Sequence, residues 1–329
     1  LTRLPCRPHD HPMTKTTNGG PAAVLGIDPA WRDRPATVRN MTPEYFCSGA
    51  SAPADMRGLS RIRHPLGVSV PFLSGPALEY LCTLRGVCPV FVDTAAFSEV
   101  DRDGAVIVPI TDDAWIGRTA VMHRIAAALG DGCLLVAPDR VGDQQETLRR
   151  LALFSDVMRA CAALGARIVV PIQRGGMSAT MFHDAAACLL GVPFVAGIPG
   201  NKAAMPPHEL EDFLRARRPA AVHLLGVGPR GPRYQALVDV LRRFVPDAAV
   251  SCDSNALAAA VGKSNGAGGA PRDLTAWQQR TGARETAVVM SLGPPSFFAR
   301  AMAAYRAEGL LETREQPLQV GLFDVPRPR

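Results

Sequence analysis

From about residue 67 onward, short continuous apolar runs alternate with amphipathic stretches. A continuous apolar run is typical of a strand that is buried on both faces, whereas apolar positions at helical spacing predict an amphipathic helix. The expected strands are 67–75, 88–97, 133–139, 167–173, 193–199, 221–228, 247–254 and 285–292, with a further β segment at 105–110. The expected helices are 76–86, 114–129, 143–164, 178–190, 206–217, 234–244 and 297–311.

This regular alternation predicts a parallel sheet covered by helices. Eight units in a chain of 329 residues favour a (β/α)8 TIM barrel. A doubly wound open sheet is the alternative, but the glycine-rich dinucleotide motif and the phosphate-binding P-loop motif are both absent. We expect an irregular N-terminal extension over 1–60, a catalytic barrel over 61–312 and a C-terminal tail over 313–329.

Composition is that of an ordinary globular protein, with 47% hydrophobic and 20% charged residues. The eight cysteines show no metal-ligand spacing, and several lie inside apolar runs. This pattern favours reduced, buried cysteines in a cytoplasmic protein, and it predicts neither disulfides nor a structural zinc. No apolar run is long enough to cross a membrane, so we expect no membrane partner.

The chain carries 36 basic and 30 acidic residues, a formal net charge of +6. Nearly all of the basic residues are arginines, which suit bidentate contacts to phosphate. A genome that prefers arginine codons is the favoured explanation of this composition. The charge is therefore compatible with a nucleic-acid partner without requiring one.

Polar side chains stand where four of the expected strands end. They are Asp93, Asp139, Gln173 and Asp253. In parallel α/β folds these ends meet at one mouth, where ligands bind. A single strand-end aspartate often only caps a turn. Three carboxylates at one mouth repel each other, which favours the interpretation that they bind a ligand or take part in a reaction. The three carboxylates are also compatible with a magnesium site. His223 falls in the middle of an expected strand and is interpreted as a hydrogen-bonded core residue rather than a metal ligand.

Six segments in register resemble the tRNA-guanine transglycosylase superfamily. They are VFVDTAAFSEV (90–100), VAPDRVGD (136–143), VPIQRGG (170–176), VAGIPGNK (195–202), VHLLGVGP (222–229) and VSCDSNALAAAVG (250–262). The resemblance covers roughly residues 67–262 and is closer to the DpdA-like group, which inserts 7-deazaguanines into DNA, than to the bacterial tRNA enzymes. It implies a pentosyltransferase that exchanges guanine in nucleic acid for a 7-deazaguanine such as preQ0, with no cofactor.

The resemblance also implies roles for individual residues. Asp253 matches the nucleophile that holds the sugar covalently, and Asp93 matches the residue that moves the proton of the departing and entering base. Asp139 and Gln173 match the side chains that bind the guanine-like edge, with Gly197 at the purine pocket. These roles agree with general chemistry, because one carboxylate can attack an anomeric carbon while a second acts as acid and then as base.

The chain departs from the family pattern in three ways. Thr94, Ala95 and Ala96 replace the Ser-Gly-Gly that follows the family's first aspartate, which would narrow the pocket or remove a flexible backbone contact. The family's zinc motif after the nucleophile is missing, and so is an appended RNA-binding domain. The preferred substrate is therefore DNA rather than tRNA. Thr94 and Gly226 complete the expected substrate-binding residues.

Basic residues near the expected mouth predict the path of the nucleic acid. They are Arg174, Lys202, Arg230 and Lys263. Two other functions stay open: a non-catalytic transglycosylase-like subunit, and an unrelated barrel lyase or aldolase. The latter enzymes often use a strand-end lysine, which this chain lacks. Whether a helper ATPase or a second copy of the chain is a partner is also left open.

Overall fold

The computed structural model describes residues 43–101, 105–200, 204–229 and 231–255, together with Leu257, Glu285 and Val288. The chain separates into two units, Leu1–Arg39 and Asn40–Arg329, and all of the described residues belong to the second. The expected tail over 313–329 and the expected helix over 297–311 lie outside the described residues.

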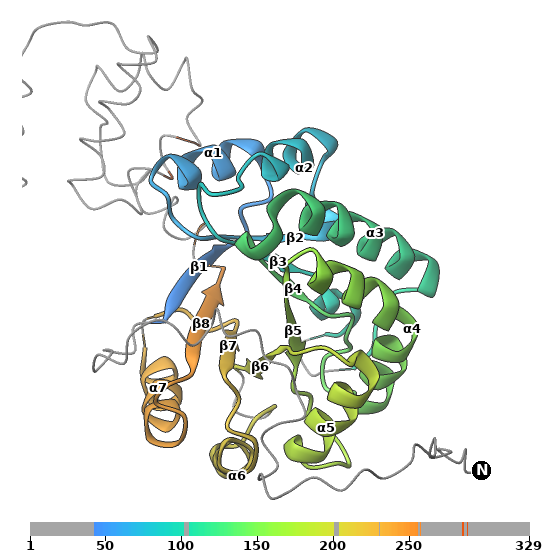
Figure 1. The fold of residues 1–329 in the computed structure, drawn as a ribbon, viewed down its shortest axis with the longest axis vertical. Helices are drawn as coiled ribbons and strands as arrows, with labels where there is room; N and C mark the ends of the chain where they lie inside the picture. Colours follow the sequence, from blue (N-terminus) through green and yellow to red (C-terminus); the bar gives the residue numbers. More distant parts are fainter. Residues whose placement is uncertain are drawn as a thin grey trace, which may run out of the picture. The chain divides into compact units, whose positions relative to one another are not determined.

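Eight parallel strands close into a barrel in which each strand pairs with its neighbours in sequence, and β8 pairs with β1 (Figure 1). The predicted (β/α)8 fold is therefore confirmed. The strands are β1 (Glu44–Ser48), β2 (Leu66–Ser69), β3 (Val90–Asp93), β4 (Cys133–Val136), β5 (Arg167–Pro171), β6 (Val195–Pro199), β7 (Ala221–Leu225) and β8 (Ala249–Ser254).

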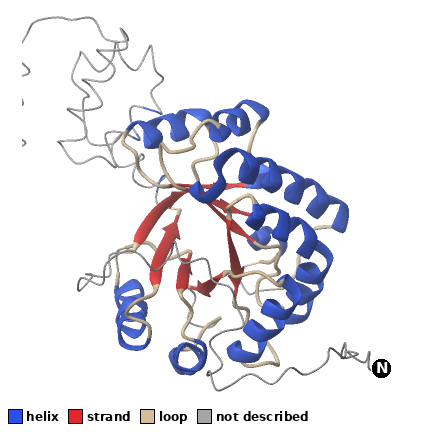
Figure 2. Ribbon diagram, viewed as in Figure 1, coloured by secondary structure: helices blue, strands red, loops and turns tan. Residues whose placement is uncertain are grey.

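Helices surround the ring of strands on the outside (Figure 2). They are α1 (Pro53–Arg61), α2 (Gly75–Cys82), α3 (Asp112–Leu129), α4 (Gln144–Ala163), α5 (Ala179–Leu190), α6 (Pro207–Arg217) and α7 (Pro232–Phe244). Ser74, Thr111, Asp143 and Ser178 cap the first turns of α2 to α5, because the side chain of each accepts a hydrogen bond from a backbone N–H. These four helix starts are thus set by local sequence.

Alternation along each strand divides its side chains between two apolar layers. The larger layer lies between strands and helices, where residues such as Val92 and Leu135 pack with Ile125 and Phe182 of the helices. The smaller layer contains strand residues and fills the barrel interior. It consists of Phe46, Phe91, Leu134, Val136, Val169, Val195 and Ala221. Side chains two residues apart on a strand share a face. By this spacing, the barrel interior also receives Asp93 from β3, His223 from β7 and Asp253 from β8.

The barrel begins earlier and ends earlier than the sequence pattern predicts. Strand β1 and all but the last residue of helix α1 fall within 1–60, for which the pattern predicts only irregular structure. The eighth strand is β8, at Ala249–Ser254, so the prediction of a strand at 285–292 is wrong. Glu285 and Val288 are helical and buried. Glu285 instead pairs with Arg57 and Arg61 of α1, outside the ring of strands.

The expected β segment at 105–110 is present only as a single bridge. Val106 pairs with Val100 in antiparallel orientation, and Ile107 and Val108 donate backbone hydrogen bonds to the carbonyl of Glu99. This loop between β3 and α3 carries exposed aliphatic side chains. Of the helices that the structure describes, none combines the length and apolar character needed to cross a bilayer.

Candidate active site

Asp253 lies near the end of β8, where three donors surround its carboxylate. The Ser48 hydroxyl donates to Oδ2 over 2.8 Å, and the backbone N–H of Gly226 donates to Oδ1 over 2.7 Å. His223 Nε2 lies 3.3 Å from the same Oδ1. The side chain is buried, yet it lies at the carboxyl end of the barrel, where TIM-barrel enzymes bind their substrates. Such donors stabilise an ionised carboxylate and restrict its rotation.

Gly226 can make this contact because of its backbone conformation. Its φ is +68°, in the left-handed region, which a residue with a Cβ adopts only at a cost. The turn after β7 therefore directs its N–H at Asp253. Gly226 was expected to bind substrate, and in the structure it contacts the candidate nucleophile itself.

Asp93 ends β3 and faces the same mouth. The hydroxyl of Ser69, its partner in the β2–β3 register, donates to its Oδ2 over 3.2 Å. Burial and, to a smaller extent, the negative charge of Asp253 raise the pKa of Asp93 to about 6. The hydrogen bond from Ser69 acts in the opposite direction. The two carboxyls are therefore close enough to influence each other. A carboxyl with a pKa near neutrality can both donate and accept a proton under physiological conditions.

Asp139 and Gln173 form a buried pair on the loops that follow β4 and β5. The amide of Gln173 donates to Oδ2 of Asp139 over 2.8 Å, and its oxygen accepts from the N–H of Gly142 over 2.8 Å. Burial raises the pKa of Asp139 to about 8, with a further contribution from the charge of Asp93. Asp139 is thus held largely as the neutral acid near pH 7, with one hydrogen-bond donor and free acceptor capacity.

Asp139→Asn should make the protein more stable at alkaline pH. Because folding raises the pKa of Asp139 from 3.8 to about 8, the folded chain binds more protons than the unfolded chain between these values. Stability therefore falls as the pH rises through this window, by about 1.4 kcal/mol per pH unit at most. Asparagine does not titrate, so the variant should exceed the wild type by several kcal/mol near pH 9 and match it near pH 4.

Urea unfolding between about pH 4 and pH 9 measures this difference. Asp131→Asn removes the same charge from an exposed position and serves as the matched control. Its stability curve should run parallel to that of the wild type. A parallel curve for Asp139→Asn as well would mean that Asp139 is ionised in the folded protein throughout this range.

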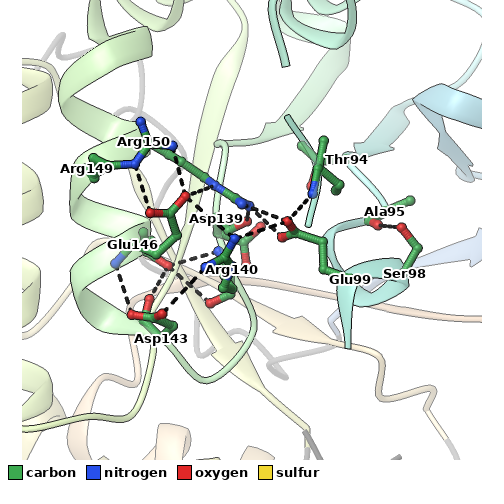
Figure 3. Close-up of polar contacts among 12 residues, drawn as sticks. Thr94, Ala95, Ser98, Glu99, Asp139, Arg140, Asp143, Glu146, Arg149 and Arg150 are labelled. Atoms are coloured by element: carbon green, nitrogen blue, oxygen red, sulfur yellow. Dashed lines mark hydrogen bonds and ion pairs between the residues drawn. The ribbon is translucent and has the colours of Figure 1, made fainter. Parts of the chain in front are cut away.

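A buried ion pair supports the loop that carries Asp139 (Figure 3). Arg150 of α4 binds both oxygens of Glu99 at 2.6 and 2.7 Å, and both side chains are fully buried. Arg150 also donates to the backbone carbonyl of Asp139 over 2.5 Å, and its guanidinium lies over the ring of Trp115 at 4.9 Å. One arginine therefore ties the loop after β3 to the loop after β4.

The three residues that follow Asp93 are buried. Ala95 has a φ of +57°, in the left-handed region where the resembled family has glycine. Ala96 packs with Trp115 and Phe154, and the side chain of Ala95 is fully buried. The carbonyl of Thr94 accepts from Arg118 over 2.6 Å, while its hydroxyl has no hydrogen-bond partner among the described residues.

Gly197 lies in the middle of β6 rather than at its end. A side chain at this position would come within 3.1 Å of Pro171 Cα and 3.0 Å of Leu225 Cδ1. The carbonyl of Gly197 accepts a hydrogen bond from Ile172 N–H within the sheet. A larger residue at this position would therefore require its neighbours in the barrel to shift slightly.

The expected nucleic-acid contacts are only partly described. Arg174 is exposed on the loop after β5. Lys202, Arg230 and Lys263 lie outside the described residues. Arg233, which also follows β7, donates to the backbone carbonyls of Gly200 and Met205. That guanidinium therefore has a structural role in holding the loop after β6.

A hollow of about 530 Å³ opens beside the Asp139–Gln173 pair. Its lining comes from the loops after β4 and β5 and from the start of α4, with Val106 at one side. It includes Arg140, Val141, Gly142, Gly175, Gly176 and Met177. Because Gly142 also binds Gln173, the hollow is adjacent to the buried pair. In the part of the chain that the structure describes, no group of three or more His, Cys, Asp or Glu side chains is arranged to hold a metal ion.

Sequence reasoning missed three residues of this site. Ser48 was missed because β1 was not recognised, and Ser69 because a serine near a strand end is not a specific signal. His223 was correctly expected to be buried, but its contact with Asp253 was not foreseen. That contact depends on the register of β7 and β8, which places His223 opposite Ser251, two residues before Asp253.

No protein-family model and no curated protein matches this chain. The fold is similar to that of distant solved structures. A xylose isomerase domain-containing protein from Salmonella typhimurium is 12% identical, with a TM-score of 0.39, and the match covers 77% of this chain and 98% of that one. An N-acetylneuraminate lyase from Mycoplasma synoviae is 9% identical, with a TM-score of 0.41 and coverage of 84% and 91%. At this identity the likeness concerns the fold alone, because barrels support many unrelated reactions.

Proposed function

We propose that this barrel is a base-exchange transglycosylase that replaces guanine in nucleic acid, DNA in preference to tRNA, with a 7-deazaguanine. The observation that carries the proposal is the pair of inward-facing carboxyls, Asp253 and Asp93, which lie in contrasting environments at one mouth. Three donors surround Asp253, whereas burial raises the pKa of Asp93 to about 6. Carboxyls whose environments differ in this way can divide the roles of nucleophile and acid.

The reaction requires two displacements at the anomeric carbon of the target nucleotide. In the first, an oxygen of Asp253 bonds to C1′ as the C1′–N9 bond breaks, and the carboxyl of Asp93 gives its proton to the leaving guanine. In the second, the carboxylate of Asp93 takes a proton from the incoming base. The nitrogen of that base then attacks C1′ and releases Asp253. Each step conserves atoms and charge, as in retaining glycosidases.

The Asp139–Gln173 pair supports recognition of a purine edge. A neutral Asp139 offers an O–H donor and a carbonyl acceptor, and Gln173 offers an amide with both functions. The edge of guanine presents complementary donors and acceptors. A base without them would leave unpaired the donors and acceptors that Asp139 and Gln173 keep beyond their bonds to each other and to Gly142, which disfavours its binding.

Incorporation of radiolabelled guanine tests the proposal directly. The purified chain is incubated with duplex DNA, single-stranded DNA or tRNA, and label in the recovered polymer is counted. Label in DNA is expected, with less in tRNA. Label in tRNA alone would reverse the substrate preference. The absence of label in every polymer, with and without cell extract, would contradict a catalytic role and favour the non-catalytic subunit.

Arg174→Ala should weaken nucleic-acid binding and flatten its salt dependence. Arg174 is exposed on the loop after β5, beside the hollow. Removing one phosphate-binding side chain reduces the slope of log K against log salt by about 0.9 for duplex DNA and about 0.7 for single strands. Binding of a fluorescent oligonucleotide at several salt concentrations gives this slope. Arg215→Ala, which removes one arginine from the outer helix α6, is the matched control and should leave the slope unchanged.

A further inference from the structure

We propose that His223 is a positioning residue that holds the carboxylate of Asp253 with Oδ2 directed at the substrate. The inference rests on the proposed function for its kinetic consequences, but its structural content can be tested without any activity. It starts from the chain of contacts from Ser251 through the imidazole to Asp253, in which the two ring nitrogens lie 2.8 Å and 3.3 Å from their partners.

The two partners of the ring select one tautomer. A carboxylate can only accept a hydrogen bond, so the nitrogen that faces Asp253 must carry a proton. The other nitrogen, Nδ1, then accepts from the Ser251 hydroxyl in the neutral ring. Ser251 and Asp253 both face inward from β8, two residues apart, so one strand supplies both contacts. The contacts therefore place a proton on Nε2, the nitrogen that faces Asp253.

Packing holds the ring in place. His223 is fully buried, and its ring stacks on Phe91 with centroids 4.4 Å apart and planes inclined by only 13°. Phe46 approaches from another side with centroids 6.1 Å apart. A ring confined between aromatic neighbours has little rotational freedom, so it holds the carboxylate above it in one orientation.

The distribution of donors distinguishes the two oxygens of Asp253. Oδ1 receives both the N–H of Gly226 and the ring of His223, whereas Oδ2 receives, from the residues that the structure describes, only the Ser48 hydroxyl. A carboxylate oxygen accepts about two hydrogen bonds in its plane, so Oδ1 is saturated and Oδ2 keeps a lone pair. Oδ2 is therefore the oxygen that attacks C1′, and His223 contributes by keeping Oδ1 turned away.

Replacement of His223 should lower kcat while leaving KM nearly unchanged. His223→Phe fills the same space but donates no hydrogen bond, so Asp253 gains freedom to rotate. We expect kcat to fall roughly 10- to 100-fold, since about 1 Å of misplacement at a reacting centre can cost 100-fold. His223→Gln places an amide N–H close to the former Nε2 and should recover most of the rate. A merely structural role would instead lower the amount of folded enzyme with both substitutions.

The tautomer provides a measurement that is independent of activity. With ¹⁵N-labelled histidine, long-range ¹H–¹⁵N NMR spectra distinguish a neutral ring protonated on Nε2 from one protonated on Nδ1. The wild type should show the Nε2–H tautomer for the resonance that disappears in His223→Gln. Ser251→Ala removes the partner of Nδ1 and should shift that nitrogen resonance. An Nδ1–H tautomer in the wild type would overturn the inference.

The two kinds of measurement separate this inference from the proposed function. If the wild type exchanges no base, the proposed function fails, while the NMR spectra still decide whether His223 donates to Asp253. If the wild type exchanges base and His223→Phe keeps its kcat within about twofold, the positioning role fails while the function stands. A lower kcat in His223→Phe, recovery in His223→Gln and the Nε2–H tautomer together support both.

Discussion

Asp253→Asn should lower base exchange by roughly 10⁴-fold or more and leave the barrel folded, since removal of a covalent nucleophile has effects of this size or larger. Asparagine keeps the shape of the side chain and an oxygen that can accept from Gly226, but it carries no charge and cannot form the ester. Exchange of labelled guanine measures the rate, and thermal unfolding confirms that the variant is folded. Near-normal exchange would remove Asp253 from its proposed role.

Capture of the intermediate identifies the attacking residue. Enzyme, oligonucleotide and base are mixed and denatured, and a protein–nucleic acid adduct is mapped by mass spectrometry. The wild type should give an adduct at Asp253, and Asp253→Asn should give none. Asp93→Asn is the informative comparison, because it lacks the acid but keeps the nucleophile. It should lose about 10²- to 10⁴-fold with guanine and still form the adduct when the leaving base needs no proton.

Arg150→Met should destabilise the protein by about 3–5 kcal/mol, the usual cost of removing one partner from a buried ion pair. The substitution leaves Glu99 buried with its charge only partly compensated and also removes a donor from the carbonyl of Asp139. Urea unfolding near pH 7 measures the loss. We also expect weaker binding of guanine, because the loop that carries Asp139 loses one of its links to α4, although Thr147 still contacts Arg140 in that loop.

Arg149→Met is the matched control for this prediction. Arg149 is the preceding residue of α4 and pairs with Asp112 and Glu146, but it is about half exposed. Exposed pairs contribute about 0–1 kcal/mol each, so this variant, which loses two pairs, should lose at most about 2 kcal/mol. Equal losses for Arg149→Met and Arg150→Met would mean that the buried Arg150–Glu99 pair contributes no more to the free energy of unfolding than the exposed pairs of Arg149.

The sequence was sufficient to place the strands from β2 to β8 because each is a continuous apolar run between helical segments. It therefore also placed Asp93, Asp139, Gln173 and Asp253 at or just after strand ends. Their common mouth follows from the topology of a parallel barrel, in which all of the carboxyl ends meet on one side. This part of the site required no knowledge of side-chain contacts.

The two errors concern the closure of the ring. Strand β1 is only five residues long, includes polar Glu44 and Ser48, and follows a segment rich in Pro, Gly and Arg. The apolar run at 285–292 wrongly predicts a strand, because a short apolar run does not distinguish a buried strand from a buried helix. Glu285 and Val288, three residues apart, are helical and both buried, as expected on one face of a helix.

The pattern of apolar and polar positions does not predict side-chain contacts between residues that are distant in the sequence. Alternation shows that His223 shares a face with other interior residues of β7, but only the register with β8 places it against Asp253. The pairing of Arg150 with Glu99 joins residues 51 positions apart, the second of which lies in a short 3-10 helix, Ala96–Glu99, after β3. Neither contact leaves a periodic signal, so three-dimensional coordinates were needed to find them.

Closure of the barrel between β1 and β8 also determines when the surroundings of Asp253 are completed during synthesis. Ser48 and Asp253 are 205 positions apart. At about 5–20 residues per second, a ribosome needs roughly 10–40 s to add the residues between them. Throughout this interval, the strands already made can form only an open sheet with unpaired edges, to which another nascent chain can bind. Asp253 acquires its Ser48 donor only when the last strand arrives, so an unfinished chain on the ribosome carries no assembled active site.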